Sequence, residues 1–209
     1  MDILQASKIN IKNHKRIYHS REGYKIRCVH EDQSYPILAN VIDDFSPELV
    51  IELGTSWGGL TKFFEDHTND STLIYSFDRP KASRRPDINK FNGARVTFLK
   101  DNILAKPVPL LIGLVRSCKR KLLYCDNGSK VKEVLMYGAC LEGGDLLGVH
   151  DWPREIYTDY GLLKPAARKL TSPEEIEALK CVLKKFSPLQ HERFLQNGLS
   201  TRFWIKKYY

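Results

Sequence analysis

The sequence lacks the paired cysteines that hold many small proteins together. Its five cysteines stand singly, without a C-x-x-C pair and without a histidine at zinc-finger spacing. This pattern argues against a disulfide framework and against a structural zinc site. We therefore expect the five thiols to be reduced.

Long apolar runs are also missing. No stretch of about 18 or more apolar residues occurs, and residues 1–15 are polar and basic without an apolar centre. The sequence therefore predicts neither a membrane span nor a secretion signal, and the cytoplasm is the expected compartment. The 209 residues suffice for one domain with a substantial buried core.

Positive charge is abundant, and the formal net charge is +8. The basic residues fall into dispersed clusters, which favours a solvated basic surface over a dedicated nucleic-acid-binding stripe. Charge of this kind bears on association rather than on chemistry. RNA stays open as an alternative partner.

Two parts of the chain differ in regularity. Residues 1–33 have no clear period, and we interpret them as an N-terminal arm or lid with a short strand at 24–29. Residues 34–209 are interpreted as one domain, which begins with a helix at 35–45. Strands and helices then alternate: strands are predicted at 49–53, 72–77, 95–99, 121–125 and 146–149, and helices at 60–67, 110–115 and 131–138.

This alternation predicts an α/β fold with a mainly parallel sheet and helices on both faces. Ser172, Pro173 and Glu175 have the spacing of a capping box, so a helix should begin there and carry its inward stripe to Phe186. Asn197-Gly198 favours a tight turn between strands at 193–195 and 202–205. We therefore expect an antiparallel hairpin to end the sheet.

The most informative segment is residues 52–59, Glu-Leu-Gly-Thr-Ser-Trp-Gly-Gly, which follows the first strand of the domain. Gly54 and Gly58 let the backbone turn tightly and approach a ligand, and the next helix presents free N–H groups. The spacing is not G-x-G-x-x-G. It matches the E/D-x-G-x-x-x-G form that holds the methionine part of S-adenosylmethionine, with Glu52 near the amino group and Thr55 and Ser56 in the loop. The alternative is a turn that only joins strand to helix.

Acidic residues end the next two strands. Asp78 follows Gly54 at a strand end, where a carboxylate can accept both ribose hydroxyl protons. Asp101 fits the position that recognises the adenine edge, although it is also compatible with an ordinary loop aspartate.

Asp126, His150 and Asp151 end the fourth and fifth strands, so they should emerge at the same edge of the sheet. Two carboxylates and an imidazole suit a divalent ion such as Mg²⁺ or Mn²⁺, which would activate a hydroxyl. His150 is alternatively a metal-free general base, or a histidine with a purely structural role. Lys130 is another candidate base, but a solvated lysine at a helix start is the favoured interpretation.

Residues 23–151 resemble the cephalosporin hydroxylase / rhamnosyl O-methyltransferase family, a class I methyltransferase group similar in site layout to catechol O-methyltransferase. The matching segments are residues 32–35, 47–59, 100–102, 122–126, 142–145 and 150–151. The resemblance implies a Rossmann-like fold and a divalent metal held by Asp126, His150 and Asp151. His150 stands where the family commonly has a carboxylate, which shifts the site toward borderline metals.

Together these features predict a methyltransferase that uses S-adenosylmethionine to methylate a hydroxyl of a small molecule or sugar. Asp126, His150 and Asp151 would position and activate the acceptor, with Mg²⁺ or Mn²⁺ as the candidate ion. Two alternatives stay open at this point: an RNA methyltransferase, and a non-catalytic subunit that binds S-adenosylmethionine.

Overall fold

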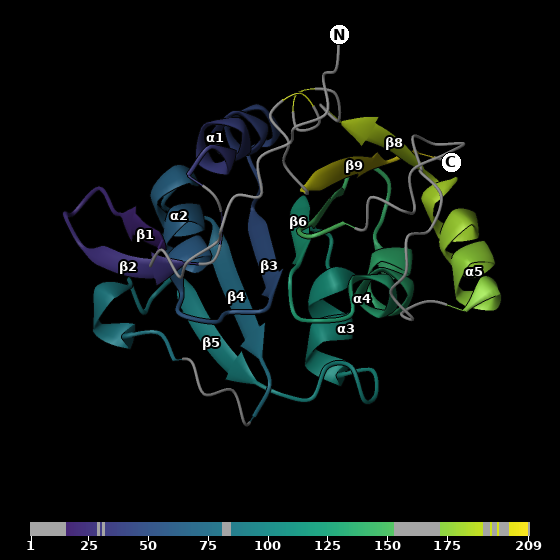
Figure 1. Ribbon diagram of the computed structural model, residues 1–209, viewed down its shortest axis with the longest axis horizontal. Helices are drawn as coiled ribbons and strands as arrows, with labels where there is room; N and C mark the ends of the chain where they lie inside the picture. Colours follow the sequence, from purple (N-terminus) through teal and green to yellow (C-terminus); the bar gives the residue numbers. More distant parts are fainter. Residues whose placement is uncertain are drawn as a thin grey trace, which may run out of the picture.

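The computed structural model describes residues 16–28, 30, 32–80, 85–152, 172–189, 193, 196 and 201–208. Within these residues, seven strands form one sheet in the order β5-β4-β3-β6-β7-β9-β8, and β1 and β2 form a separate hairpin (Figure 1). The central sheet is composed of β3 Leu49–Leu53, β4 Leu73–Asp78, β5 Val96–Lys100, β6 Lys121–Cys125, β7 Leu146–Val149, β8 Phe186–Leu189 and β9 Arg202–Lys206.

Strands β3 to β7 run parallel, and β9 pairs antiparallel with both β7 and β8. The order of strands reverses between β3 and β6. In open α/β sheets ligands bind at such a switch point, beyond the carboxyl ends of the strands. The predicted parallel sheet with a terminal antiparallel hairpin is confirmed.

Helices cover both faces of the sheet because the buried strands carry apolar side chains on both faces. Helices α1 Ser34–Phe45 and α2 Gly59–His67 pack with Val50 and Leu122 on one face. Helices α3 Pro109–Val115, α4 Lys130–Met136 and α5 Pro173–Leu183 pack with Ile51 and Leu123 on the other. Two short 3₁₀ turns, η1 Ile88–Lys90 and η2 Gly138–Cys140, lie in connections.

The last helix and the strand after it differ from the sequence-based prediction. The capping box of α5 is present, with Ser172 and Glu175 bonding each other's backbone N–H groups. The helix ends at Leu183, however, and Phe186 begins β8 instead of extending the helical stripe. The hairpin partner of β9 is therefore Phe186–Leu189, and the strand predicted at 193–195 is wrong at Arg193, which is helical. The Asn197-Gly198 turn lies outside the described residues.

The hairpin of β1 Arg16–His19 and β2 Lys25–Cys28 is anchored to α2. Tyr18 and Cys28 belong to the hydrophobic cluster of α1 and α2, and the Tyr18 hydroxyl donates to Asp66 of α2 over 2.8 Å. A Cβ at Gly59 would lie 2.4 Å from Cys28 Cβ, so only glycine permits this approach. The division into an arm of residues 1–33 and a domain of residues 34–209 stays a prediction.

The five cysteines lie on strands, helices and connections of the described chain. None of the five cysteines, all of which lie in the described residues, forms a disulfide, and Cys28 and Cys125 are buried. Among the described residues, no helix combines the length and the apolar character needed to cross a membrane.

Candidate active site at the switch point of the sheet

The glycine loop leaves β3 where the strand order reverses. Gly54 adopts φ +114°, and a Cβ on it would lie 2.6 Å from the carbonyl carbon and oxygen of Asp126. The Asp126 N–H also donates to the Leu53 carbonyl over 2.7 Å. The end of β3 and the end of β6 therefore lie in direct backbone contact, which only glycine allows at position 54.

Glu52 lies completely buried beneath this loop. Its Oε2 accepts hydrogen bonds from Thr61 Oγ1 of α2 over 2.5 Å and from Ser76 Oγ of β4 over 2.6 Å. Its Oε1 has no hydrogen-bond partner in the described part of the chain. Burial raises the pKa of the Glu52 carboxyl to about 8, against the opposing effect of the two hydroxyl donors.

The loop residues predicted to bind the cofactor are tied to the next strand. Thr55 Oγ1 lies 2.5 Å from Ser76 Oγ, and the Ser56 N–H donates to Asp78 Oδ2 over 3.1 Å. Gly58 adopts φ +81° and its N–H donates to the Thr55 carbonyl over 2.8 Å. The loop is thus a closed turn, and Asp78 holds its outer end.

Asp78 and Asp101 are neighbours at the carboxyl edge. The Asp101 N–H donates to the Asp78 carbonyl oxygen over 3.0 Å. The two Asp78 carboxylate oxygens accept from the N–H groups of Ser56 and Arg79, which leaves further lone pairs for a ligand. The structure therefore places the predicted ribose and adenine residues side by side.

A narrow cleft opens beside the loop. Its lining includes Glu52, Gly54, Ser56, Asp126 and His30. Gly54 and Asp126, predicted from separate motifs, thus share one cavity. Asp78 is not among the lining residues, but it accepts a hydrogen bond from the N–H of Ser56, which is one of them.

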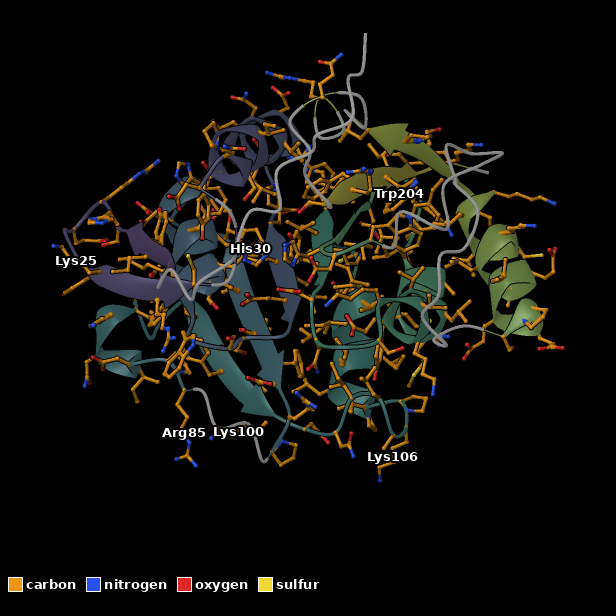
Figure 2. The ribbon with its side chains drawn as sticks, in the orientation of Figure 1. Lys25, His30, Arg85, Lys100, Lys106 and Trp204 are labelled. Carbon is orange, nitrogen blue, oxygen red and sulfur yellow. The ribbon has the colours of Figure 1, made fainter. Side chains whose placement is uncertain are left out.

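Two imidazoles converge on Asp126. His150 Nδ1 lies 3.0 Å from Asp126 Oδ1, and His30 Nε2 lies 3.5 Å from Asp126 Oδ2. The two histidine rings are 4.1 Å apart between centroids. In Figure 2 His30 lies near the centre of the view, whereas Lys25, Lys100 and Lys106 project at the periphery. One potential ligand atom from each of His30, Asp126 and His150 lies within 4.8 Å of the others.

The charges of this trio support one another. Burial disfavours the Asp126 carboxylate, but the hydrogen bond to His150 and the positive charges of His150, His30 and Lys130 hold its pKa well below the usual range. Burial likewise disfavours the His150 imidazolium, but Asp126 and Asp151 outweigh it and raise the pKa of His150. Asp126 is therefore a buried carboxylate kept ionised by its neighbours.

The loop after β6 is ordered by a buried glutamate of α4. Glu133 accepts from the N–H groups of Asn127 over 3.3 Å and Ser129 over 3.2 Å. Burial raises the pKa of its carboxyl to about 7. Because these bonds span the residues just after Asp126, Glu133 fixes the direction in which Asp126 leaves the sheet.

The structure can be compared with the sequence-based expectations for Asp126, His150, Asp151 and Lys130. Asp126 and His150 meet as predicted, whereas the Asp151 carboxylate is mostly exposed and lies 3.6 Å from His150 Nδ1. The interpretation of Lys130 as a solvated lysine is wrong, because its Nζ lies 3.0 Å from Asp126 Oδ1 and its side chain is largely buried.

Sequence reasoning missed His30, which follows β2 in the segment interpreted as an arm. One signal was present: like Asp126 and His150, His30 comes directly after a predicted strand. The position of that strand relative to the sheet was not predictable, because no motif links residues 24–29 to the later strands.

Comparison with known proteins relates the fold to solved structures. No protein-family model matches the sequence, and no curated protein sequence matches it either. The structure is similar to the MycE methyltransferase of the mycinamycin biosynthetic pathway in complex with Mg, SAH and mycinamycin VI, at a TM-score of 0.55 and 13% identity. That match covers 83% of this chain and 48% of MycE, so the chain spans about half of the MycE length.

Two further structures resemble the chain over more of their own length. The SAH-bound methyltransferase PaMTH1 of Podospora anserina matches with a TM-score of 0.54 and 16% identity, over 86% of this chain and 80% of PaMTH1. The apo structure of CmcI-N160 matches with a TM-score of 0.59 and 14% identity, over 91% and 76%. The fold is therefore the Rossmann-like methyltransferase fold that the sequence predicted.

Proposed function

We propose that this chain is an S-adenosylmethionine-dependent methyltransferase that methylates a hydroxyl of a small molecule or sugar. The observation that carries the proposal is Glu52, whose fully buried carboxyl group lines the cleft with one oxygen lacking a partner among the described residues. A buried acceptor of this kind is costly unless a donor binds it. The ammonium group of the cofactor's methionine part is such a donor.

The remaining loop residues fit the rest of the same ligand. Gly54 leaves room where a side chain would strike Asp126, and it lines the cleft together with Glu52. Asp78 has lone pairs for the ribose hydroxyls, and Asp101 lies beside it for the adenine edge. When bound, S-adenosylmethionine supplies a sulfonium-bound methyl group that an oxygen nucleophile displaces.

Asp126, His150 and Asp151 are proposed to prepare the acceptor. The hydrogen bond from His150 Nδ1 to Asp126 orients the imidazole and leaves Nε2 for an acceptor hydroxyl. Asp151, next in the chain and exposed, can accept a hydrogen bond from the acceptor. Holding the hydroxyl in line with the methyl group is expected to supply most of the rate.

Binding of S-adenosylhomocysteine (SAH), measured by calorimetry, tests the cofactor assignment. Asp78→Ala should weaken binding about tenfold, since it removes an acceptor of two hydroxyl hydrogen bonds. Asp70→Ala is the matched control, because Asp70 precedes the same strand at its other end and is fully exposed. An Asp78→Ala protein with unchanged affinity would contradict the ribose assignment, and absence of SAH binding by the wild type would contradict the proposal.

Turnover separates an enzyme from a subunit that only binds the cofactor. The wild type should transfer methyl groups to at least one member of a panel of catechol, sugar and macrolide hydroxyls, supplied with and without divalent ions. Asp126→Asn should lower the rate by about a hundredfold or more while SAH binding persists. SAH binding without methylated product from any acceptor would favour the non-catalytic alternative.

A further inference from the structure

The trio beside the cleft has the composition of a transition-metal site. It contains two imidazoles and one carboxylate from three separate segments: His30 after β2, Asp126 after β6 and His150 after β7. Hydroxyl-binding magnesium sites consist mainly of oxygen ligands, whereas imidazole ligands suit iron, zinc, cobalt and nickel. The described ligand set is therefore different from the Asp126, His150 and Asp151 set expected from the sequence.

The spacing of the ligand atoms fits one ion. Zinc binds histidine nitrogen and carboxylate oxygen at about 2.0–2.2 Å, which places two ligand atoms of a tetrahedral ion about 3.3–3.5 Å apart. His150 Nδ1 lies 3.0 Å from Asp126 Oδ1, and His30 Nε2 lies 3.5 Å from Asp126 Oδ2. The two imidazoles thus approach the two oxygens of one carboxylate at separations near that value. Small side-chain rotations would bring the three atoms, which already lie within 4.8 Å of one another, around a common centre.

The surroundings also favour a bound ion. The side chains of His30 and Asp126 are 2% and 7% exposed, so an ion here would be shielded from water on the protein side. Both residues line the cleft beside Glu52 and Gly54, which provides an approach for a ligand oxygen. Three protein ligands leave at least one coordination position open, as in catalytic zinc sites.

Asp151 is the alternative third ligand, and the structure favours His30 over it. The Asp151 carboxylate lies 3.6 Å from His150 Nδ1 but is 69% exposed. His30 is buried and faces the carboxylate of Asp126 directly. A soft or borderline ion would gain a second imidazole from His30, whereas Mg²⁺ would gain nothing from it.

We propose that His30, Asp126 and His150 bind a divalent transition-metal ion of the Fe²⁺ or Zn²⁺ class, in preference to Mg²⁺. The ion's role, as a Lewis acid toward the acceptor oxygen, rests on the proposed methyltransferase function; its binding does not. Lys130, whose Nζ lies 3.0 Å from Asp126 Oδ1, competes with the ion for that oxygen.

The test is calorimetric titration of the chelator-treated full-length chain with Zn²⁺, Mn²⁺ and Mg²⁺ separately. One Zn²⁺ per chain should bind, with an affinity at least about tenfold above that for Mg²⁺. Co²⁺ loading should produce a visible absorption band whose position reports nitrogen ligands. Equal or tighter binding of Mg²⁺, or no binding of any ion, would overturn the proposal.

Variants identify the ligands. His30→Gln and His150→Gln should each weaken Zn²⁺ binding about tenfold to a hundredfold or more, since even loss of a residue supporting a ligand costs that much. His19→Gln, at an exposed position of β1, is the control for adventitious histidine binding. Lys130→Gln should tighten Zn²⁺ binding, because it removes the competing cation. Weakening by Asp151→Asn with no effect of His30→Gln would assign the site to the carboxylate pair instead.

SAH binding keeps this result separate from the proposed function. If the chain binds SAH but no metal, the metal site fails and the cofactor assignment stands. If it binds Zn²⁺ through His30 but does not bind SAH, the metal site stands and the cofactor assignment fails. Circular dichroism of each variant shows whether it is folded, and the comparison of Zn²⁺ with Mg²⁺ on the wild type needs no variant at all.

Discussion

Helix α2 separates two groups of buried charge that are built differently. On one side, Lys62 Nζ contacts Glu65 over 2.7 Å, Glu22 over 2.9 Å and Asp66 over 3.2 Å. On the other side, the preceding residue of the helix, Thr61, donates to Glu52 over 2.5 Å. Adjacent residues of one helix thus serve a cluster of ion pairs and a lone carboxylate.

The difference is in how many oxygen atoms have partners. Each oxygen of the two buried carboxylates in the Lys62 cluster has a donor: the second Glu65 oxygen accepts from Asn92, and the second Asp66 oxygen accepts from Tyr18 and Arg21. Glu52, by contrast, has one oxygen with two donors and one with none in the described residues. The Lys62 cluster, in which every buried carboxylate oxygen has a partner, holds the hairpin on α2. Glu52 has an oxygen that can still accept a hydrogen bond from a ligand.

The largest expected effect on stability comes from removing the positive charge of the Lys62 cluster. Lys62→Met should lower the free energy of unfolding by about 3–5 kcal/mol, because it leaves buried carboxylates without their counter-charge. Denaturant titration of the variant measures this loss. Lys90→Met is the control: the Lys90–Asp87 pair is partly exposed and 3.7 Å long, so its loss should cost at most about 1 kcal/mol. If both variants lost the same free energy of unfolding, the Lys62 cluster would contribute no more to stability than an exposed ion pair.

Replacing the Glu52 carboxyl group by a neutral amide should weaken cofactor binding. Glu52→Gln should weaken SAH binding about tenfold to a hundredfold, as expected for a lost hydrogen bond between charged groups of about 1.5–3 kcal/mol. Calorimetry measures the affinity, and Glu65→Gln is the matched control, since it alters the Lys62 cluster and should leave SAH binding intact. An unchanged affinity in Glu52→Gln would show that the free oxygen does not meet the cofactor.

The smallest expected effect is the pH dependence of stability due to Glu52. Its pKa of about 8 in the fold lies above the usual unfolded value near 4.3, so between these values the folded chain holds the extra proton. Raising the pH in this range therefore destabilises the fold. The difference in unfolding free energy between wild type and Glu52→Gln should shift against the wild type by up to about 1.4 kcal/mol per pH unit from pH 5.5 to 7. A pH-independent difference would contradict the raised pKa.

The local sequence pattern predicted most of the helices and strands, and it predicted that Asp126 and His150 lie together. The run of residues 121–125 and the stripe from Tyr35 to Phe45 appear in the structure as a strand and a helix at nearly the predicted bounds. Asp126 and His150 meet because both end parallel strands, which the sequence shows directly. These features depend on neighbours in the chain.

The misses depend on contacts that are distant in sequence. Phe186 fits the helical stripe of α5, and Pro188 argues against a strand, yet β8 is the edge strand, where proline is tolerated. His30 joins Asp126 across 96 residues only because the hairpin docks on α2. Lys130 looked solvated because the burial of Asp126 is a property of the folded site.

Because of the contact between Gly59 and Cys28, the pocket is complete only when the β1–β2 hairpin is packed against α2. Gly59 begins α2 directly after the cofactor loop, and the strand it touches is the one that leads to His30. A chain in which the first hairpin had detached would lose the His30 imidazole and a wall of the cleft together. A molecule whose hairpin has not yet docked on α2 therefore lacks a complete pocket, and His30 joins Asp126 and His150 when the hairpin docks.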